Sequence, residues 1–131
     1  MKVVALDFGR ARTGVAVSDP TGVVARPLGV VERAATPDGL AQLAALIAEQ
    51  EAERVVVGLP LTLRGEAGEQ ARETLEFVDK LAAVTDVPVV TYDERFTTDL
   101  AERVRAGAPE DARAAAYLLS SYLTWSSGAR A

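Results

Sequence analysis

The chain of 131 residues contains no cysteine and no histidine. Without cysteine it has neither a disulfide framework nor a thiolate metal site. Without histidine, zinc sites and catalysis by Ser/His or Cys/His pairs are largely excluded. Any metal ion bound by this chain would therefore be a hard cation held by oxygen atoms, such as magnesium or manganese.

Long apolar runs are also missing. No run approaches the roughly 18 residues that a membrane span needs. The chain leads from Met1 straight into an apolar, strand-like run, so we expect no signal peptide, no membrane partner and a cytoplasmic protein. A hydrophobic fraction of 49% over 131 residues predicts a single domain, residues 1–131, with a frayed tail over about residues 126–131.

The net charge of −5 argues at first against a nucleic-acid partner, but the charges are unevenly distributed. Residues 1–35 carry five basic and three acidic side chains, whereas residues 36–86 carry four and ten. Twelve of the fourteen cations are arginine, whose planar side chain suits bidentate contact with phosphate. The net charge therefore does not exclude a nucleic-acid partner.

The apolar pattern predicts an α/β fold. Runs at residues 3–6, 13–19 and 28–31 predict three consecutive strands, of which the first two form a hairpin. Runs at residues 55–59 and 89–92 predict two more strands, each preceded by an amphipathic helix. The three strands can form an antiparallel meander, and right-handed crossovers place the last two parallel to the first. We therefore expect a mixed five-stranded sheet with helices on both faces.

The helices have recognisable starts and faces. Thr36 and Pro37 are typical of a helix start. A short helix is expected from Thr97 or Thr98 to about Arg105, and a last helix begins at Pro109. The inward faces of the second and last helices are predicted to consist of Ala71, Leu75, Val78 and Ala82, and of Ala115, Leu118, Leu119 and Tyr122.

Three acids stand where a site could form. Asp7 ends the first strand, Glu94 follows the fifth, and Asp111 lies in the first turn of the last helix. Sites in such sheets form at the carboxyl ends of the parallel strands. If the last helix packs near the first strand, the three acids converge and repel one another unless a cation lies between them. On spacing alone, Asp7 could be an ordinary turn acid, Glu94 could belong to a local ion pair in a loop, and Asp111 could be an ordinary acid at a helix start.

Four sequence motifs are more specific than the spacing of the three acids. They are LDFG at residues 6–9 continuing into RTGVAVSD at 12–19, VVGLP at 56–60 with Gly65 and Gly68, DERFTT at 93–98, and Asp111 followed by AA at 114–115 and LL at 118–119. In order and separation they resemble the YqgF/RuvX family of ribonuclease H-like proteins, which are known as pre-16S rRNA nucleases or Holliday junction resolvases. The resemblance extends over nearly the whole chain.

The resemblance implies a ribonuclease H-like fold and a catalytic, metal-binding triad of Asp7, Glu94 and Asp111. It also implies a Mg²⁺- or Mn²⁺-dependent endonuclease acting on structured nucleic acid. We expect maturation of the 5′ end of precursor 16S rRNA, with ribosomal particles as further partners, and cleavage of four-way DNA junctions as the alternative.

The chain departs from the family in its basic residues. Family members often carry a run of lysines and arginines before the Asp111 motif, whereas residues 102–110 hold only two cations here. This shifts the expected phosphate contacts to other residues. The nucleic-acid-binding residues are predicted to be Arg10, Arg12, Arg64, Arg95, Thr97 and Thr98. Gly9, Gly58 and Gly65 would let a sugar–phosphate backbone approach closely, although glycine in turns usually serves the backbone conformation.

Two other functions fit parts of the sequence. The acidic balance and weak basic patch also suit a non-catalytic RNA- or ribosome-binding module. The motif at residues 7–9 resembles a phosphate loop of the actin and sugar-kinase group, but that group needs two such domains and 131 residues supply one. Symmetric cutting of a four-way junction requires a dimer, and the sequence indicates a monomer or a weak dimer.

Overall fold

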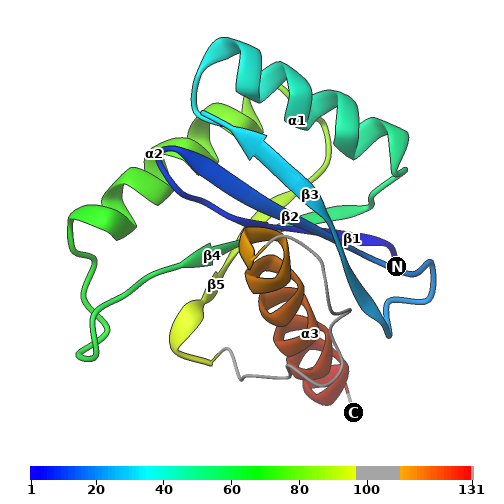
Figure 1. The fold of residues 1–131 in the computed structure, drawn as a ribbon. Helices are drawn as coiled ribbons and strands as arrows, with labels where there is room; N and C mark the ends of the chain where they lie inside the picture. The colour runs from blue at the N-terminus through cyan, green and yellow to red at the C-terminus, as the bar shows by residue number, and fades with distance from the viewer. Residues whose placement is uncertain (97–109, 131) are drawn as a thin grey trace.

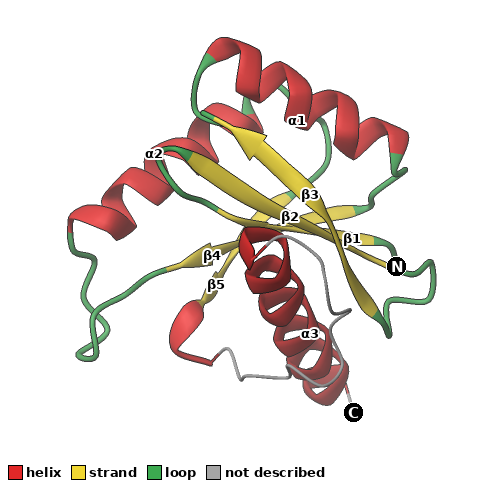
Figure 2. Cartoon of the chain, in the orientation of Figure 1, coloured by secondary structure: helices red, strands yellow, loops and turns green. Residues whose placement is uncertain are grey.

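The computed structural model describes residues 1–96 and 110–130, which contain a five-stranded sheet (Figures 1 and 2). The sheet order is β3-β2-β1-β4-β5. The strands are β1 (Val3–Asp7), β2 (Arg12–Ser18), β3 (Ala25–Glu32), β4 (Arg54–Leu59) and β5 (Val89–Asp93). The first three pair antiparallel, whereas β4 lies parallel to both β1 and β5. The predicted mixed sheet is confirmed.

Helices cover both faces of this sheet. Figure 1 shows α1 (Pro37–Glu49) and α2 (Glu69–Ala82) on one face and α3 (Glu110–Arg130) on the other. The alternation of side chains along β1 explains the arrangement. Val4 and Leu6 belong to the apolar core under α1 and α2, whereas Val3 and Ala5 belong to the core under α3. Both faces of β1 are therefore buried, which fixes its position in the centre of the sheet.

Small residues allow α3 to lie close to the sheet. Its core contains alanines from both the sheet and the helix: Ala5, Ala16, Ala115 and Ala116. At Gly14 in β2, an added Cβ atom would lie 1.8 Å from the carbonyl oxygen of Asp111. Only a residue without a side chain fits at this contact, so Gly14 determines how closely the start of α3 approaches β2.

The predicted helix start and the face of α3 are confirmed. The side-chain oxygen of Thr36 accepts a hydrogen bond from the backbone N–H of Gly39 at 3.2 Å, and Pro37 is the first residue of α1. The four residues predicted for the inward face of the last helix are all buried. The short helix expected from Thr97 or Thr98 to about Arg105 lies outside the described residues.

The predicted inward face of α2 is confirmed at Ala71 but wrong by about one position farther along the helix. Its buried residues are Ala71, Thr74, Phe77 and Leu81, whereas Leu75 is 38% exposed. The ring of Phe77 stacks on that of Phe8 with centroids 4.4 Å apart, which turns the helix toward the β1 end of the core. Thr74 tolerates burial because its hydroxyl donates to the carbonyl of Gln70 at 2.9 Å.

The end of the described chain is helical. Helix α3 continues to Arg130, past the predicted start of the frayed tail at Ser126. Ser126 and Ser127 line a shallow hollow with Met1 and Arg54, so the last turns of the helix lie near the starts of β1 and β4. Within the described part of the chain, no helix is both long and apolar enough to cross a membrane.

Candidate active site

Asp7 and Glu94 meet at one edge of the sheet. Asp7 is the last residue of β1, and Glu94 begins a short 3-10 turn (Glu94–Phe96) directly after β5. The two strands flank β4 and run in the same direction, so their carboxyl ends emerge together. The side chains of Asp7 and Glu94 are hydrogen-bonded to each other. Parallel strands thus bring together two acids separated by 86 intervening residues.

The surroundings of this pair favour its protonated form. Burial raises the pKa of Asp7, and the charge of Asp111 raises it further, while the hydrogen bond with Glu94 lowers it. Burial, the charge of Asp7 and the hydrogen bond between them raise the pKa of Glu94 to about 7. One proton shared between two half-buried carboxylates relieves their repulsion. A bound cation would relieve it in the same way.

The space around the pair is shaped by a glycine and by α3. At Gly58 in β4, an added Cβ atom would lie 2.5 Å from a carboxylate oxygen of Glu94. The space that we expected Gly58 to leave for a sugar–phosphate backbone is therefore occupied by Glu94. Beside the two acids lies a hollow of about 340 Å³, lined on the other side by Ala114, Tyr117 and Leu118 of α3.

Asp111 lies near this pair but has a different partner. Its carboxylate oxygen Oδ2 is 3.2 Å from Nε of Arg12, at the start of β2. Its charge acts on Asp7, as the raised pKa of Asp7 indicates. Within residues 1–96 and 110–130, no three acidic side chains are arranged to hold one metal ion. The structure thus joins two members of the predicted triad and pairs the third with an arginine.

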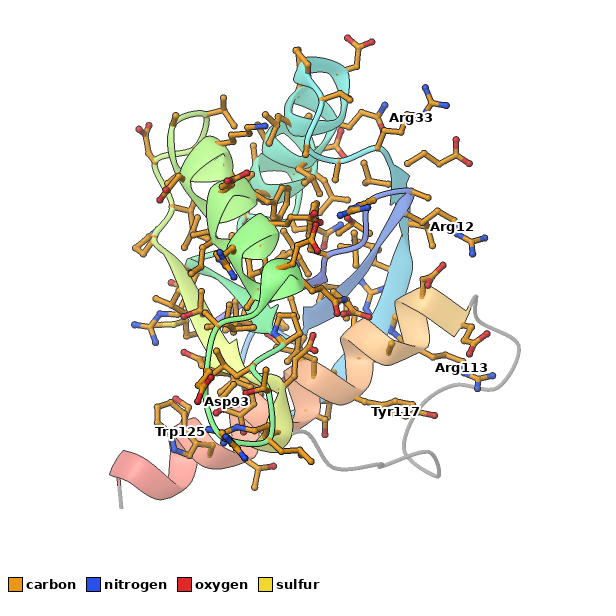
Figure 3. All side chains as sticks on the ribbon, turned by 90° about the vertical axis from the view of Figure 1, so that its left-hand side faces the viewer. Arg12, Arg33, Asp93, Arg113, Tyr117 and Trp125 are labelled. Atoms are coloured by element: carbon orange, nitrogen blue, oxygen red, sulfur yellow. The ribbon has the colours of Figure 1, made fainter. Side chains whose placement is uncertain are left out.

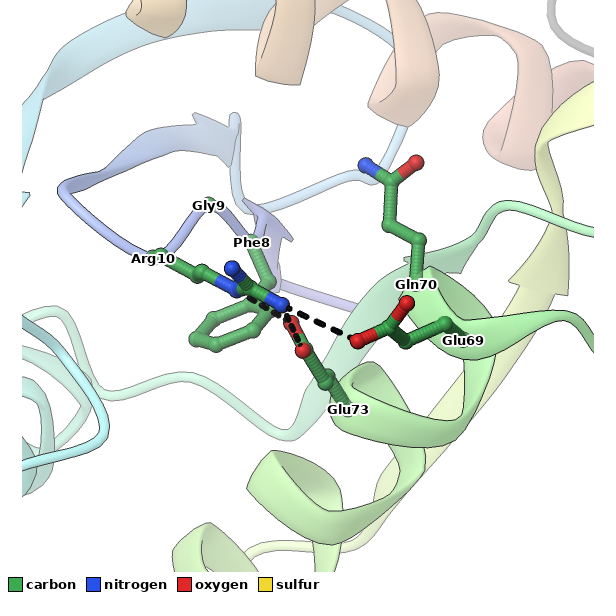
Figure 4. Close-up of a pocket in the computed structure, with 6 residues that line it drawn as sticks. All are labelled: Phe8, Gly9, Arg10, Glu69, Gln70 and Glu73. Carbon is green, nitrogen blue, oxygen red and sulfur yellow. Dashed lines mark hydrogen bonds and ion pairs between the residues drawn. The ribbon is translucent and has the colours of Figure 1, made fainter.

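Arg10 is held by the acidic face of α2 (Figure 4). Its Nε donates to Oε2 of Glu73 at 2.8 Å, and its Nη2 contacts both Glu73 and Glu69, the latter at 3.5 Å. These side chains line a hollow of about 470 Å³ together with Phe8 and Gln70. The hydrogen bond from Arg10 lowers the pKa of Glu73. Arg10 is thus next to the site, with its charge balanced by protein carboxylates.

The other predicted nucleic-acid contacts are spread along the same edge. Arg95 binds Asp93 through Nε and Nη2, and its Nη1 donates to the carbonyl of Leu63 at 3.3 Å. This contact holds the loop after β4 against the end of β5, and Gly65 lies beside the same guanidinium. Arg64 is exposed in that loop. The remaining two, Thr97 and Thr98, lie outside the described residues.

Several residues that line the hollow beside the two acids were not predicted to belong to the site. Ala114 and Leu118 follow Asp111 at intervals of three and seven, which is the spacing of one helix face and could have revealed them. Tyr117 lies beside that face and had no such signal. Figure 3 shows Arg33 and Arg113 on the same flank as Arg12. Neither forms an ion pair with another described residue.

Comparisons with known sequences agree with the motifs. Residues 1–125 match the sequence model of a family described as "RuvX: Holliday junction resolvase". A protein of Desulforudis audaxviator is 41% identical over 132 residues, covering 94% of each chain, and one of Chloroflexus aggregans is 47% identical over 78% of this chain and 72% of its own. Both are named "Putative pre-16S rRNA nuclease".

Comparisons with solved structures agree on the fold. Thermus thermophilus RuvC in complex with a Holliday junction substrate superposes with a TM-score of 0.66 at 17% identity, covering 98% of this chain and 96% of that one. The fowlpox virus Holliday junction resolvase gives a TM-score of 0.57 at 13% identity, over 95% and 99% of the two chains. At these identities the likeness is one of fold, and it confirms the predicted ribonuclease H-like architecture.

Proposed function

Because the chain belongs to the RuvX family, we propose that it is an endonuclease that hydrolyses phosphodiester bonds in structured nucleic acid. We propose the 5′ end of precursor 16S rRNA as its substrate, as the names of the relatives from Desulforudis and Chloroflexus suggest. The observation that carries the proposal is the Asp7–Glu94 pair, which lies beside an open hollow at the carboxyl edge of the sheet.

The residues at this edge fit a hard divalent cation, Mg²⁺ or Mn²⁺. All the side chains offered are carboxylates, in a chain that has no histidine or cysteine. Asp7 and Glu94 are held close enough to form a hydrogen bond, and after burial the charge of Asp7 is the largest contribution to the raised pKa of Glu94; Gly58 leaves the room that Glu94 needs. We propose that these two acids hold the cation and that Asp111 is the third ligand. A bound divalent cation would activate water and stabilise the leaving oxygen of a phosphodiester.

The chain's own residues would position the substrate. The strand ends hold Asp7 and Glu94 on rigid elements, which favours a fixed geometry over that of a mobile loop. Tyr117 and Leu118 form the opposite wall of the hollow and limit how a nucleic-acid strand enters it. Arg10, in the turn between β1 and β2, and Arg12, directly after it, would contact the sugar–phosphate backbone as the scissile bond approaches the acids.

The test compares the wild-type protein with the variant Asp7→Asn on two substrates, a precursor-rRNA 5′ end and a four-way DNA junction. Each is assayed with Mg²⁺, Mn²⁺ and chelator. We expect the variant to lose at least about 10³-fold in cleavage rate, because one carboxylate of the cation site is removed. Asp79→Asn, on the solvent face of α2, makes the same chemical change away from the site and should leave the rate unchanged.

The outcomes separate the competing functions. Retained cleavage by Asp7→Asn would overturn the assignment of the site. Preferred cutting of the junction would favour the resolvase function, to which the family description points. That function requires two active sites and hence a dimer, so sedimentation of a strict monomer would count against it. Binding of RNA without cleavage by the wild-type protein would favour a non-catalytic module.

A further inference from the structure

Arg10 lies in the turn between β1 and β2 and Arg12 directly follows that turn, and each is paired with an acid on a different helix. Arg10 contacts Glu73 and Glu69 of α2, on one side of the sheet edge. Arg12 contacts Asp111 in the first turn of α3, on the other side. The pairs are alike in chemistry but differ in one respect. Of the acids involved, only Asp111 is proposed above to bind a cation.

The Arg12–Asp111 contact conflicts with the role proposed for each residue. The oxygen Oδ2 of Asp111 lies 3.2 Å from Arg12 Nε, so one edge of the guanidinium faces a carboxylate and not a phosphate. The same ion pair partly neutralises the charge that Asp111 would offer to a cation. The two proposed roles are therefore compatible only if both residues change partners.

The geometry makes such an exchange inexpensive. The side chains of Arg12 and Asp111 are 63% and 39% exposed, so solvent screens their attraction and little packing holds them together. Exposed ion pairs of this kind contribute little to stability. Asp111 also acts electrostatically on Asp7, whose pKa its charge raises after burial, so breaking the pair leaves Asp111 facing another carboxylate.

We infer that Arg12 and Asp111 form an exchange pair that couples cation binding to nucleic-acid binding. When Asp111 turns to a cation shared with Asp7, Arg12 loses its carboxylate and becomes available to a phosphate. Conversely, a phosphate that takes Arg12 leaves Asp111 available to the cation. This inference rests on the proposed function, because it takes Asp111 as a ligand and Arg12 as a phosphate contact.

The surroundings of Arg12 suit a phosphate. Arg33 and Arg113 lie on the same flank of the molecule (Figure 3), and neither is ion-paired with another described residue. The side-chain Nε of Arg113 is buried and has no hydrogen-bond partner among the described residues. A backbone phosphate placed beside Arg12 would therefore lie on a flank that carries two further arginines without an ion-pair partner among the described residues.

The first test measures Mn²⁺ affinity without nucleic acid, from the electron paramagnetic resonance signal of unbound Mn²⁺. Arg12→Gln releases Asp111, so we expect it to bind Mn²⁺ about threefold more tightly than the wild-type protein. Arg10→Gln is the matched control. It removes the same charge from the same turn, but its partners on α2 are not proposed ligands, so the Mn²⁺ affinity should stay within the error of the measurement.

The second test measures nucleic-acid binding by fluorescence anisotropy, with Ca²⁺ in place of Mg²⁺ and with chelator. We expect Ca²⁺ to raise the affinity of the wild-type protein for the labelled precursor-rRNA 5′ end by about tenfold, and that of Arg12→Gln by only about threefold. Arg10→Gln should bind more weakly under both conditions while keeping the tenfold ratio, because its partner exchange does not involve the cation site.

The outcomes distinguish this inference from the proposed function. If Arg12→Gln and Arg10→Gln show the same Mn²⁺ affinity and the same Ca²⁺ ratio, the coupling is overturned even where the wild-type protein cleaves RNA. If the wild-type protein binds no Mn²⁺ and cleaves nothing, the proposed function itself fails. A change in both quantities for Arg12→Gln alone supports the exchange.

Discussion

The candidate site has two carboxylate contacts of opposite kinds. At the ends of β1 and β5, Asp7 and Glu94 form an acid–acid contact between two groups whose pKa values are both raised, above all by burial. At the start of α3, Asp111 forms an acid–base contact with Arg12. The first is repulsive when both groups are ionised, whereas the second is attractive. The two contacts therefore need different support from the rest of the protein.

The repulsive contact depends on the sheet. Asp7 and Glu94 stay together because β1 and β5 are both paired with β4. Burial of the apolar core offsets the unfavourable free energy of bringing the two carboxylates together. The attractive contact needs no such support and can be broken by a competing ion. We conclude that the Asp7–Glu94 pair at the strand ends, here called the strand pair, is the preformed part of the candidate site, and that the side chain of Asp111 is its adjustable part.

The largest expected effect comes from separating α3 from the sheet. In Gly14→Ala the new Cβ atom would meet the carbonyl oxygen of Asp111 at 1.8 Å, and both partners are backbone, so the start of α3 must shift. We expect the free energy of unfolding to fall by about 3 kcal/mol in urea titrations. Gly29→Ala in β3 is the control, because an added Cβ atom there meets nothing within 4 Å.

Gly14→Ala also tests whether the Asp7–Glu94 and Arg12–Asp111 contacts are held independently of each other. The shift should weaken the Arg12–Asp111 contact and leave the Asp7–Glu94 contact in place, since neither of those acids lies on α3. Infrared detection of the protonated carboxyl groups in the folded protein would show whether the strand pair persists. Equal stability of Gly14→Ala and Gly29→Ala would contradict the close packing of α3 against β2.

The sequence was informative about the strand pair and poor about the helix contacts. Strand direction follows from short connections and right-handed crossovers, so the meeting of Asp7 and Glu94 could be deduced from the order of elements. The partner of Arg10 could not, because 63 positions separate it from Glu73 and the contact depends on how α2 is rotated. That rotation was mispredicted: Leu75 was expected to face inward, yet Phe77 does.

The roles of individual glycines could also not be predicted from the sequence. Gly58 and Gly65 were expected to admit a sugar–phosphate backbone, but they lie against the side chains of Glu94 and Arg95. Gly14 is part of a β-type run and gave no sign that a helix backbone touches it. A glycine shows only that space is needed, and the group that fills it is determined by tertiary packing.

A medium effect is expected from changing the strand pair alone. In Gly58→Ala the new Cβ atom would lie 2.5 Å from Oε1 of Glu94, which is the end of a flexible side chain, so Glu94 turns away and the fold persists. We expect cleavage to slow by about 10- to 100-fold, because a displacement near 1 Å at a reacting centre has that cost. Gly29→Ala should cleave at the wild-type rate.

Stability separates this displacement from unfolding. Gly58→Ala should unfold within about 1 kcal/mol of the wild-type protein, since only a side chain has to move. A large loss of stability together with the loss of cleavage would mean that Gly58 supports β4 itself. Full activity at unchanged stability would mean that the position of Glu94 does not matter for the reaction, and would remove the strand pair from the proposed site.

The smallest effect is a gain of stability with a defined pH dependence. The pKa of Glu94 is raised to about 7 in the folded protein from an ordinary value of 4.5, so between these pH values the folded state binds more protons than the unfolded state. Wild-type stability should therefore fall as pH rises from about 4.5 to 7.

Glu94→Gln removes this loss of stability, while its amide can still donate a hydrogen bond to Asp7. In chelator we expect the variant to be about 1 kcal/mol more stable at pH 8, after allowing for solvent screening of a half-buried group, and equal to wild type at pH 4.5. Asp111→Asn should show the opposite sign, a loss of up to about 1 kcal/mol at pH 8, because it removes an attraction. Urea titrations at the two pH values measure both. If Glu94→Gln were the less stable protein at pH 8, the contact between Asp7 and Glu94 would be attractive, and the contrast between the two parts of the site would be lost.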